Sequence, residues 1–397
     1  MKKNSEPPIA IIGAGIGGLT LALALLKQNK NVRIFEKVSE FAEIGAGLSL
    51  APNCSKVLQR LGLLKKIAQY ADTPQSGFIV LGDTGEQIHQ TPFSEIEPVF
   101  GHPYYQIHRA RCHQLLLDEV LAHDPDCIEM NTELLAINQS GEQMSLEFKS
   151  RRQQSVACVI GCDGVRSTVR KLYFDETAPL FTGYVAWRAL VPMKDIDASY
   201  QRSESVVNLM HQRQFVHYPI NLGQYLNVAA FAEQDWQIES WTEPADIDEM
   251  HRVYSDFRPS VHELIDAIDP AHCFKWALYD RDPIDVWSKG RVVLMGDAAH
   301  PVLPYLGQGA AMAIEDAWYL SQAIAIHNDY SAAFAVFQQA RKVRADWVLQ
   351  ESRAAGQRFA TEKPSTKTYD NDKAMSTRVM FGFDPISECE QAYTSAV

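Results

Sequence analysis

Two segments that lie far apart in this chain of 397 residues carry the residue types that hold a dinucleotide. The first reads Gly13-Ala-Gly-Ile-Gly-Gly18 and is followed by Glu36, and the second reads Gly296-Asp-Ala-Ala-His-Pro301. Glycines allow a backbone turn to approach phosphates, and a carboxylate accepts hydrogen bonds from sugar hydroxyls. The first segment predicts a bound dinucleotide. The second favours FAD over NAD, which moves the expected chemistry from simple hydride transfer toward oxygen.

The glycines of the first segment have separate physical roles. Gly13 permits a tight turn, Gly15 lets the backbone approach a pyrophosphate, and Gly18 lets the following helix pack closely on the strand. The start of that helix offers N–H groups and the positive end of its dipole to the phosphates. Glu36 then accepts hydrogen bonds from ribose hydroxyls.

The elements that must position these residues occur in the required order. A buried strand is predicted over Ile9–Ile12, a helix over Leu19–Leu26, and a second strand over Asn31–Phe35. The alternative is a signal peptide or a membrane span over Ile9–Leu26. It is disfavoured because the run contains the glycines of the turn, is marginal in length for a bilayer, and has no convincing small-residue cleavage site after it.

Composition excludes several classes of protein. A net charge of −12 argues against a nucleic-acid partner, because a phosphate backbone requires a basic surface. The seven cysteines are scattered, and the pair Cys158 and Cys162 has no second ligand pair, so no metal site is predicted. Buried thiols in a reducing cytoplasm are the better interpretation. A soluble enzyme without a membrane span, either a monomer or a homodimer, is expected.

Two later strands end in a glycine and an aspartate before a helix. Ala157–Ile160 leads to Asp163-Gly164, and Arg291–Met295 leads to Gly296-Asp297. Such positions resemble the carboxyl ends of parallel strands, where open α/β sheets bind ligands. Between them the pattern changes to period two, for example over Gln214–Ile220, which predicts an antiparallel sheet.

The predicted fold is therefore α/β, with a Rossmann-like FAD-binding domain, an inserted and mostly antiparallel substrate domain, and a C-terminal helical segment. Residues 1–75, 101–180 and 273–330 are assigned to the discontinuous FAD-binding domain. Residues 76–100 and 181–272 form the β-sheet domain, to which Phe78–Leu81 adds a strand. Residues 331–397 form the C-terminal helix and tail, and the polar tail after Glu362 is expected to lie over the surface until the aromatic segment Met380–Asp384.

Together these signatures resemble the class A flavoprotein aromatic hydroxylases, which are single-component FAD monooxygenases. The resemblance covers nearly the whole chain and is strongest to the branch with salicylate hydroxylase, 3-hydroxybenzoate 6-hydroxylase and 6-hydroxynicotinate 3-monooxygenase. Supporting phrases are Ile44-Gly-Ala-Gly47, Trp276–Pro283, Gly307–Ala317 and, near the C-terminus, Phe381–Asp384. It implies hydroxylation of a small hydroxylated or carboxylated aromatic ring, in the catabolism of aromatic compounds.

The resemblance also implies roles for individual residues. Asp297 would hold the ribityl chain of FAD, and the N–H groups of Gly307, Gln308, Gly309 and Ala310 would point at the flavin pyrimidine. Arg109 would contact the pyrophosphate or ribityl region. Asp163 and Gly164 would lie between FAD and a transient NADH or NADPH, for which the sequence has no second glycine-rich fingerprint. Pro301 would lie near the flavin face and the substrate.

The implied mechanism is reduction of FAD by NAD(P)H, addition of O₂ at flavin C4a, and transfer of the terminal oxygen of the hydroperoxide to the ring. A base with a pKa near 7 would ionise a phenol, which favours histidine. His217 and Tyr218 lie on opposite faces of one strand, and either face is compatible with the sequence. His300 is interpreted as structural, His211 as a surface residue near a turn, and His108 as packed.

The chain departs from its relatives around the substrate. Gln214 and Pro304 replace a histidine and a glutamine of the 3-hydroxybenzoate enzyme, and the hydroxynicotinate branch has histidines near Ser49 and Tyr305. None of the catalytic sets of these relatives therefore transfers intact, and a substrate that differs from all three is compatible with the sequence. Tyr305 is a candidate phenol-binding hydroxyl, and Arg188 is a candidate for a substrate carboxylate or a structural ion pair.

Three alternatives stay open at this point. The chain could be an epoxidase, oxidase or reductase of the same fold with a nonaromatic substrate. It could be a flavin-binding redox sensor without turnover, in which an aromatic ligand would not stimulate NAD(P)H oxidation. It could also be a colourless NAD-dependent dehydrogenase.

Overall fold

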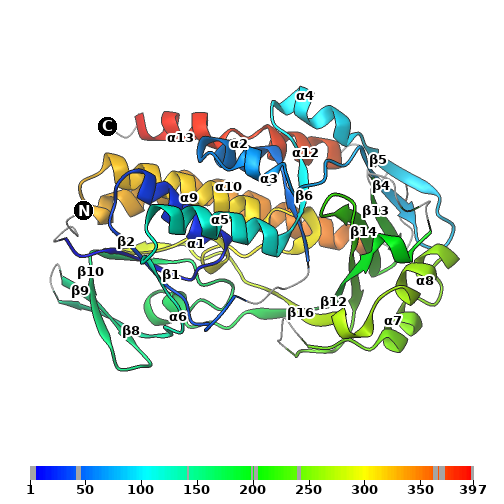
Figure 1. The fold of residues 1–397 in the computed structure, drawn as a ribbon, viewed down its shortest axis with the longest axis horizontal. Coiled ribbons are helices and arrows are strands. Elements are labelled where there is room, and N and C mark those ends of the chain that lie inside the picture. The colour runs from blue at the N-terminus through cyan, green and yellow to red at the C-terminus, as the bar shows by residue number, and fades with distance from the viewer. Residues whose placement is uncertain are drawn as a thin grey trace.

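The computed structural model describes residues 6–41, 46–140, 143–197, 200, 204–238, 243–360, 365 and 372–394. The N-terminal part of the phrase Ile44-Gly-Ala-Gly47 lies outside these residues. The described part of the chain forms an elongated molecule with one large sheet toward each end (Figure 1).

The first sheet has six strands in the order β17-β18-β11-β1-β2-β7. The neighbours of β1 and the pair β11–β18 are parallel, and β17 alone pairs antiparallel. Its strands are β1 (Ile9–Ile12), β2 (Val32–Phe35), β7 (Ile128–Glu129), β11 (Cys158–Gly161), β17 (Ser288–Lys289) and β18 (Val292–Leu294). The expected Rossmann-like α/β core is present, and β1 and β11 are buried along their whole length.

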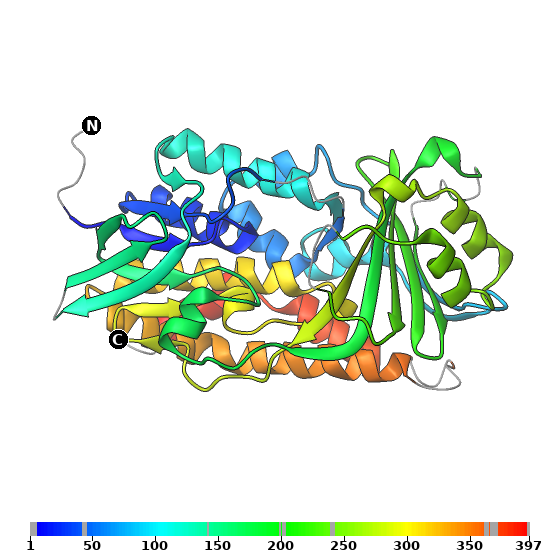
Figure 2. The same ribbon diagram turned by 90° about the horizontal axis from the view of Figure 1, so that it is seen from below.

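Helices pack against this sheet and share one apolar core with it. They are α1 (Ile16–Lys27), α2 (Pro52–Arg60), α3 (Leu64–Ile67), α5 (Arg109–His123), α6 (Thr168–Tyr173), α9 (Gly309–Ile326) and α10 (Tyr330–Phe359). Figure 2 shows α10 running along most of the length of the molecule. A short ribbon of β3 (Gly47–Leu50) and β6 (Tyr105–His108) leads from this half toward the second sheet.

The second sheet has seven strands in the order β16-β12-β15-β14-β13-β4-β5, and all neighbours are antiparallel except β13 and β4. The strands are β4 (Ser76–Leu81), β5 (Gln87–Thr91), β12 (Leu180–Pro192), β13 (Glu204–Met210), β14 (Arg213–Ile220), β15 (Tyr225–Glu233) and β16 (Phe274–Asp280). The expected antiparallel insert and its strand from Phe78 are confirmed. Strand β16 extends the sheet past residue 272, and the exact domain boundaries stay a prediction.

Two helices cover one face of the second sheet, α7 (Ile247–Val253) and α8 (Pro259–Asp266). Their apolar residues form a core with Phe215, Trp187 and Val228 that is separate from the core of the first sheet. The opposite face carries a smaller apolar cluster that includes Phe231 and Tyr305.

Two parts of the chain differ from the sequence expectations. The meander β8 (Leu134–Ser140), β9 (Gln143–Phe148) and β10 (Gln153–Val156) was not predicted, although Met144, Leu146 and Phe148 alternate as buried residues. The tail after Glu362 was expected over the surface only as far as the aromatic segment Met380–Asp384, and its described part forms two helices that were not predicted, α12 (Asp372–Gly382) and α13 (Pro385–Thr394). Met380 and Phe381 are buried there, because α4 (Ile96–Phe100) and the start of α2 offer apolar partners.

Short 3-10 turns complete the fold. They are η1 (Phe93–Glu95), η2 (Met193–Asp195), η4 (Pro270–His272), η5 (Gly296–Ala298) and η6 (Pro304–Leu306). Among the residues that the structure describes, no helix is both long and apolar enough to cross a membrane.

Candidate functional site

The glycine turn after β1 leaves open space at the start of α1. A Cβ on Gly18 would lie 2.1 Å from the carbonyl oxygen of Gly13, so Gly18 is required for packing. Among the residues that the structure describes, none has a heavy atom within 4 Å of the place where a Cβ on Gly15 would stand. No side chain caps the N-terminus of α1. Backbone N–H groups at this end therefore face space into which a phosphate fits.

Glu36 is held beside this turn by two backbone groups. The N–H of Ala14 donates to Glu36 Oε2 at 2.8 Å, and the N–H of Val38 donates to Oε1 at 3.1 Å. A carboxylate has about four lone-pair sites, so both oxygens keep acceptor capacity for the hydroxyls of a ribose.

Arg109, the first residue of α5, and Asp297, in η5, lie close enough for their charges to interact, and we call the region around these two side chains the recess. Solvent reaches both side chains, yet protein atoms surround them closely. Burial raises the pKa of Asp297, and the nearby charges of His300 and Arg109 oppose that rise. Burial likewise lowers the pKa of Arg109, and Asp297 opposes it. An aspartate and an arginine of opposite charge thus face one recess.

The start of α9 closes this recess. Gly307 has φ +63°, a left-handed conformation suited to glycine, and Gln308 and Gly309 follow it into the helix. A Cβ on Gly309 would lie 4.0 Å from Asp297 Oδ1, and a Cβ on Gly307 would lie 3.6 Å from the Cβ of Ser49. The structure therefore brings Asp297, Ser49 and the first N–H groups of α9, including that of Ala310, into one neighbourhood.

Asp163 and Gly164 have different surroundings. The Asp163 carboxylate accepts hydrogen bonds from the Ser167 hydroxyl and, at 3.0 Å, from the N–H of Val169, so it caps α6. Burial raises the pKa of Asp163 and these hydrogen bonds oppose the rise. Gly164 has φ +80° and open space where a Cβ would stand. The carboxylate is therefore occupied at the start of α6, whereas the space beside Gly164 is open among the described residues.

These residues fit FAD. The open N-terminus of α1 suits a pyrophosphate, the fixed carboxylate of Glu36 suits a ribose, and the recess beside Asp297 suits a ribityl chain. Pro301 is buried directly after this recess. His300 is also buried, and its Nε2 lies 2.6 Å from Asp316 Oδ2, in agreement with the structural role predicted for it.

The second sheet turns Tyr218 and His217 to opposite sides. A Cβ on Gly47 would lie 2.4 Å from the Tyr218 hydroxyl, so Tyr218 faces the ribbon that leads to the FAD recess. The His217 ring lies 6.3 Å from the ring of Phe215 and 6.2 Å from that of Tyr200, on the side covered by α7 and α8. The structure therefore places His217 away from the site.

The electrostatic environment also disfavours His217 as a base. Burial, with a smaller effect of the Arg258 charge, lowers its pKa to about 3. His217 is therefore neutral at pH 7, but its conjugate acid is too strong for it to hold a phenol proton. Burial raises the pKa of Tyr218, so this tyrosine stays protonated and can donate a hydrogen bond.

Of the remaining substrate candidates, Tyr305 and Gln214 lie on the same face of the second sheet as Tyr218. The Tyr305 ring lies 5.9 Å from that of Phe231, and burial raises the pKa of Tyr305. Gln214 is buried on β14, two alternations from Tyr218 and so on its face. Pro304 is exposed at the start of η6.

Arg188 is buried on β12 against aromatic rings. Its guanidinium lies 5.2 Å from the centre of the Trp276 ring and 5.7 Å from that of Phe274. Burial and, next, the charge of Arg109 lower the pKa of Arg188 to about 10. Because its charge interacts with that of Arg109, Arg188 lies where the substrate face meets the FAD recess.

Of the two other candidate histidines, His108 lies opposite Gly47 in the ribbon of β3 and β6. His211 is exposed in the turn between β13 and β14, as predicted. His108 is half-buried as the residue before α5.

Sequence reasoning missed several residues that hold the site together. Asn227 Oδ1 accepts from the N–H of Gly47 at 2.6 Å, and Tyr104 hydrogen-bonds Ser49. His113 Nε2 donates to the carbonyl of Ala14 at 2.8 Å, one turn into α5. Such contacts join residues that are distant in sequence, so no local sequence pattern reveals them.

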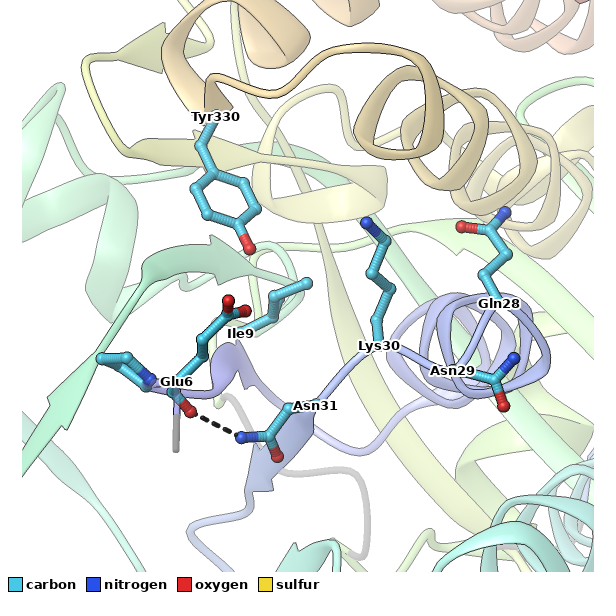
Figure 3. A pocket seen from close by; sticks show the side chains of 8 residues that line it. Glu6, Ile9, Gln28, Asn29, Lys30, Asn31 and Tyr330 are labelled. Atoms are coloured by element: carbon cyan, nitrogen blue, oxygen red, sulfur yellow. Dashed lines mark hydrogen bonds between the residues drawn. The ribbon is translucent and has the colours of Figure 1, made fainter. Parts of the chain in front are cut away.

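Two hollows lie apart from this site. One, of about 240 Å³, lies near the start of β1 (Figure 3), where Asn31 Nδ2 donates to the carbonyl of Glu6 at 2.9 Å. It is lined by Glu6, Pro7, Ile9, Gln28, Asn29, Lys30, Asn31 and Tyr330. The other, of about 520 Å³, lies between α9 and α13. Neither contains a predicted site residue.

Comparison with known proteins gives one consistent result. Residues 6–352 match the FAD binding domain family. The chain is 31% identical to 3-amino-4-hydroxybenzoate 2-monooxygenase PtmB3 of Streptomyces platensis, over 96% of this chain and 97% of that protein. It is 34% identical to 3-hydroxybenzoate 6-hydroxylase of Polaromonas naphthalenivorans, over 89% and 88%. The structure of a salicylate hydroxylase substrate complex matches with a TM-score of 0.82 and 25% identity, over 98% of each chain.

Proposed function

Because the chain belongs to the FAD binding domain family, we propose that it is an FAD-dependent monooxygenase that hydroxylates a small aromatic ring with NAD(P)H and O₂. One oxygen atom enters the ring, the other leaves as water, and NAD(P)H is oxidised to NAD(P)⁺. FAD, when bound, supplies the electron transfer from NAD(P)H and the activation of O₂. The resemblance to single-component aromatic hydroxylases expected from the motifs is thereby confirmed.

The chain would hold FAD at four places. The N-terminus of α1 binds the pyrophosphate, and Glu36 accepts from the ribose next to the adenine. Asp297 accepts from a ribityl hydroxyl, beside Arg109. The N–H groups at the start of α9 face the pyrimidine, where a positive dipole end stabilises the negative charge of the reduced flavin.

The substrate ring would bind between the start of α9 and the face of the second sheet that carries Tyr218 and Tyr305. Both hydroxyls stay protonated because burial raises their pKa, so they donate hydrogen bonds to a substrate oxygen. Such donors stabilise a phenolate relative to a phenol, and the phenolate is the more nucleophilic ring.

Arg188 would bind an anionic group of the substrate. Burial and Arg109 disfavour its charge, and a carboxylate or phenolate next to it would raise its pKa again. The rings of Trp276 and Phe274 hold the guanidinium in place. This arrangement favours an aromatic acid, and two relatives are named for hydroxybenzoates.

The observation that carries the proposal is the contact between the two halves of the molecule. The N–H of Gly47 donates to Asn227 Oδ1 at 2.6 Å, and the Tyr218 hydroxyl lies against Gly47. Ser49, two residues on, lies beside Gly307 at the start of α9. The proposed position of the flavin and the sheet face that carries Tyr218 and Tyr305 are thus adjacent, an arrangement suited to excluding bulk water from the reacting ring.

The test is a visible spectrum of the purified protein, followed by NADH and NADPH oxidation with a panel of hydroxybenzoates and hydroxypyridine carboxylates. We expect the absorption of oxidised flavin, faster oxidation with at least one aromatic acid, and a product heavier by one oxygen in mass spectrometry. A flavin spectrum without stimulation or product by any member would contradict the hydroxylase. A colourless protein that FAD does not reconstitute would contradict the cofactor.

We also propose that the protein works in the cytoplasm as a monomer or a homodimer. Six of its seven cysteines are buried thiols, which supports a reducing compartment. Light scattering coupled to size-exclusion chromatography would give the mass in solution, and a larger assembly would contradict the proposal.

A further inference from the structure

A cluster of buried charges lies behind the recess. Glu315 and Asp316 are neighbours on α9, and Arg341 lies opposite them on α10, all three fully buried. Arg341 Nε is 2.7 Å from Asp316 Oδ1, and Arg341 Nη2 is 2.7 Å from Glu315 Oε2. Arg344 adds a two-point contact with both oxygens of Glu315, each at 2.7 Å.

Both carboxylates are charged in this setting. Burial raises the pKa of Glu315, but Arg344 and Arg341 outweigh it and lower the pKa overall. Burial also raises the pKa of Asp316, and His300 and Arg341 outweigh that effect. Buried ion pairs are weak evidence for stability, since apolar residues often replace them without loss. The hydrogen bonds that these two carboxylates make to groups outside the ion pairs are more informative.

Asp316 points toward the segment that carries Asp297. Its Oδ2 accepts from the N–H of Gly296 at 2.9 Å and lies 2.6 Å from His300 Nε2. Gly296 has φ +58° and directly precedes Asp297. One carboxylate oxygen therefore fixes both ends of the turn that presents Asp297 to the recess.

Glu315 points toward the start of α9 through Asn53. Asn53 Nδ2 donates to Glu315 Oε1 at 2.6 Å and lies 3.1 Å from Gln308 Oε1. Asn53 is fully buried and Gln308 nearly so. Gln308 directly precedes the first residue of α9. The Glu315 carboxylate thus fixes the turn whose N–H groups face the proposed pyrimidine position.

We propose that Glu315 and Asp316 are positioning residues that divide the FAD site between them. Asp316 positions the Asp297 turn, and Glu315, through Asn53, positions the N-terminus of α9. The inference rests on the proposed FAD site but not on any particular substrate. It predicts that disturbing the two links has different consequences, although the two carboxylates are adjacent and share Arg341.

The Asp297 turn contacts the ribityl chain, which has the same charge in oxidised and reduced flavin. The variant Asp316→Asn should therefore weaken binding of both forms alike, by about tenfold, since a charge-assisted hydrogen bond contributes about 1.5 kcal/mol or more. The start of α9 faces the position where negative charge appears on reduction. The variant Asn53→Ala should bind reduced flavin about tenfold less well relative to oxidised flavin, which lowers the two-electron potential by about 30 mV.

The experiment measures, on holoprotein and on reconstituted apoprotein, the dissociation constant of FAD and the midpoint potential of the bound flavin. Lys342→Gln is the matched control, because Lys342 pairs with Asp346 on the outer side of α10. Thermal unfolding of each apoprotein reports folding separately. If Asp316→Asn does not fold, Asp316→Glu keeps the charge against Arg341 but displaces the oxygen from Gly296, and the same loss of affinity is expected.

The proposed division predicts that the Asp316 variant binds FAD more weakly at an unchanged flavin potential. It also predicts that the Asn53 variant has a lowered flavin potential. Parallel losses of affinity and apoprotein stability in both variants, at unchanged potential, would show that the cluster is only structural and overturn it. A wild-type protein that binds no FAD would overturn both this inference and the proposed function. A wild-type holoprotein that hydroxylates no aromatic acid would overturn the proposed function alone.

Discussion

The FAD recess and the substrate face differ in how the sequence encodes them. The recess is built from short continuous phrases, each at the end of a strand: Gly13–Gly18 supplies a turn and a helix start, and Gly296–Pro301 supplies a turn and the polar side chain of Asp297. The substrate face is built from single positions on separate strands, such as Arg188 on β12 and Tyr218 on β14. A cofactor common to many enzymes is recognised by backbone geometry, whereas a particular substrate is recognised by side chains that vary independently.

The largest effect is expected at the recess. Asp297→Ala removes the acceptor for the ribityl chain and leaves Arg109 without its opposite charge, so we expect FAD to bind about 100-fold more weakly. Titration of apoprotein with FAD measures this. Asp285→Ala, an exposed aspartate, is the control and should bind FAD as the wild type does. Equal affinities in Asp297→Ala and wild type would place the ribityl chain elsewhere.

The next effect concerns the substrate face. Arg188→Gln removes the proposed anion partner, and we expect the KM for an aromatic acid to rise about 30-fold, as for loss of a charge-assisted hydrogen bond. FAD affinity should not change. Steady-state kinetics with an aromatic acid and with its uncharged amide tests this role. The amide has no negative charge for Arg188 to bind, so its KM should change much less in the variant than the KM of the acid. A KM that rises equally for both compounds would indicate a structural role for Arg188.

A third comparison separates packing from ligand approach within the recess itself. At Gly15 the backbone has φ −73°, which alanine adopts, and a Cβ would meet nothing. Gly15→Ala should therefore leave the unfolding free energy of apoprotein unchanged but weaken FAD about tenfold, because the methyl group intrudes on the pyrophosphate. Gly18→Ala should destabilise the apoprotein by about 2 kcal/mol, since its Cβ overlaps the Gly13 carbonyl. Denaturant unfolding and FAD titration of both variants test this difference. Similar losses of apoprotein stability in the two variants would contradict the separate roles of Gly15 and Gly18.

The sequence predicts the recess better than the substrate face for a physical reason. Glycines, Glu36 and Asp297 act through local turns, and their spacing reveals the turn. The direction of His217 depends on which face of the second sheet is covered, and helices α7 and α8, more than 25 residues away in sequence, decide that. Links such as Asn53 to Glu315 depend on the packing of α2 against α9, which no local pattern encodes. The helices α12 and α13 of the tail were not predicted, and the burial of Phe381 depends on partners near residues 51 and 96.

The smallest catalytic effect is expected at Tyr218, and its neighbour His217 is the internal control. Tyr218→Phe removes a neutral hydrogen bond to the substrate oxygen, so kcat/KM should fall severalfold, by about 1 kcal/mol, while folding is unaffected. His217→Leu should leave kcat/KM unchanged, because the ring lies on the covered side of the sheet.

His217→Leu should instead change the pH dependence of stability. Folded His217 has a pKa of about 3, below its unfolded value, so the unfolded chain binds a proton first as the pH falls. The wild type should then lose about 2 kcal/mol of unfolding free energy between pH 7 and pH 5 that the leucine variant keeps. If His217→Leu abolished turnover at unchanged stability, the assignment of the two faces of β14 would be reversed, and with it the position of the substrate.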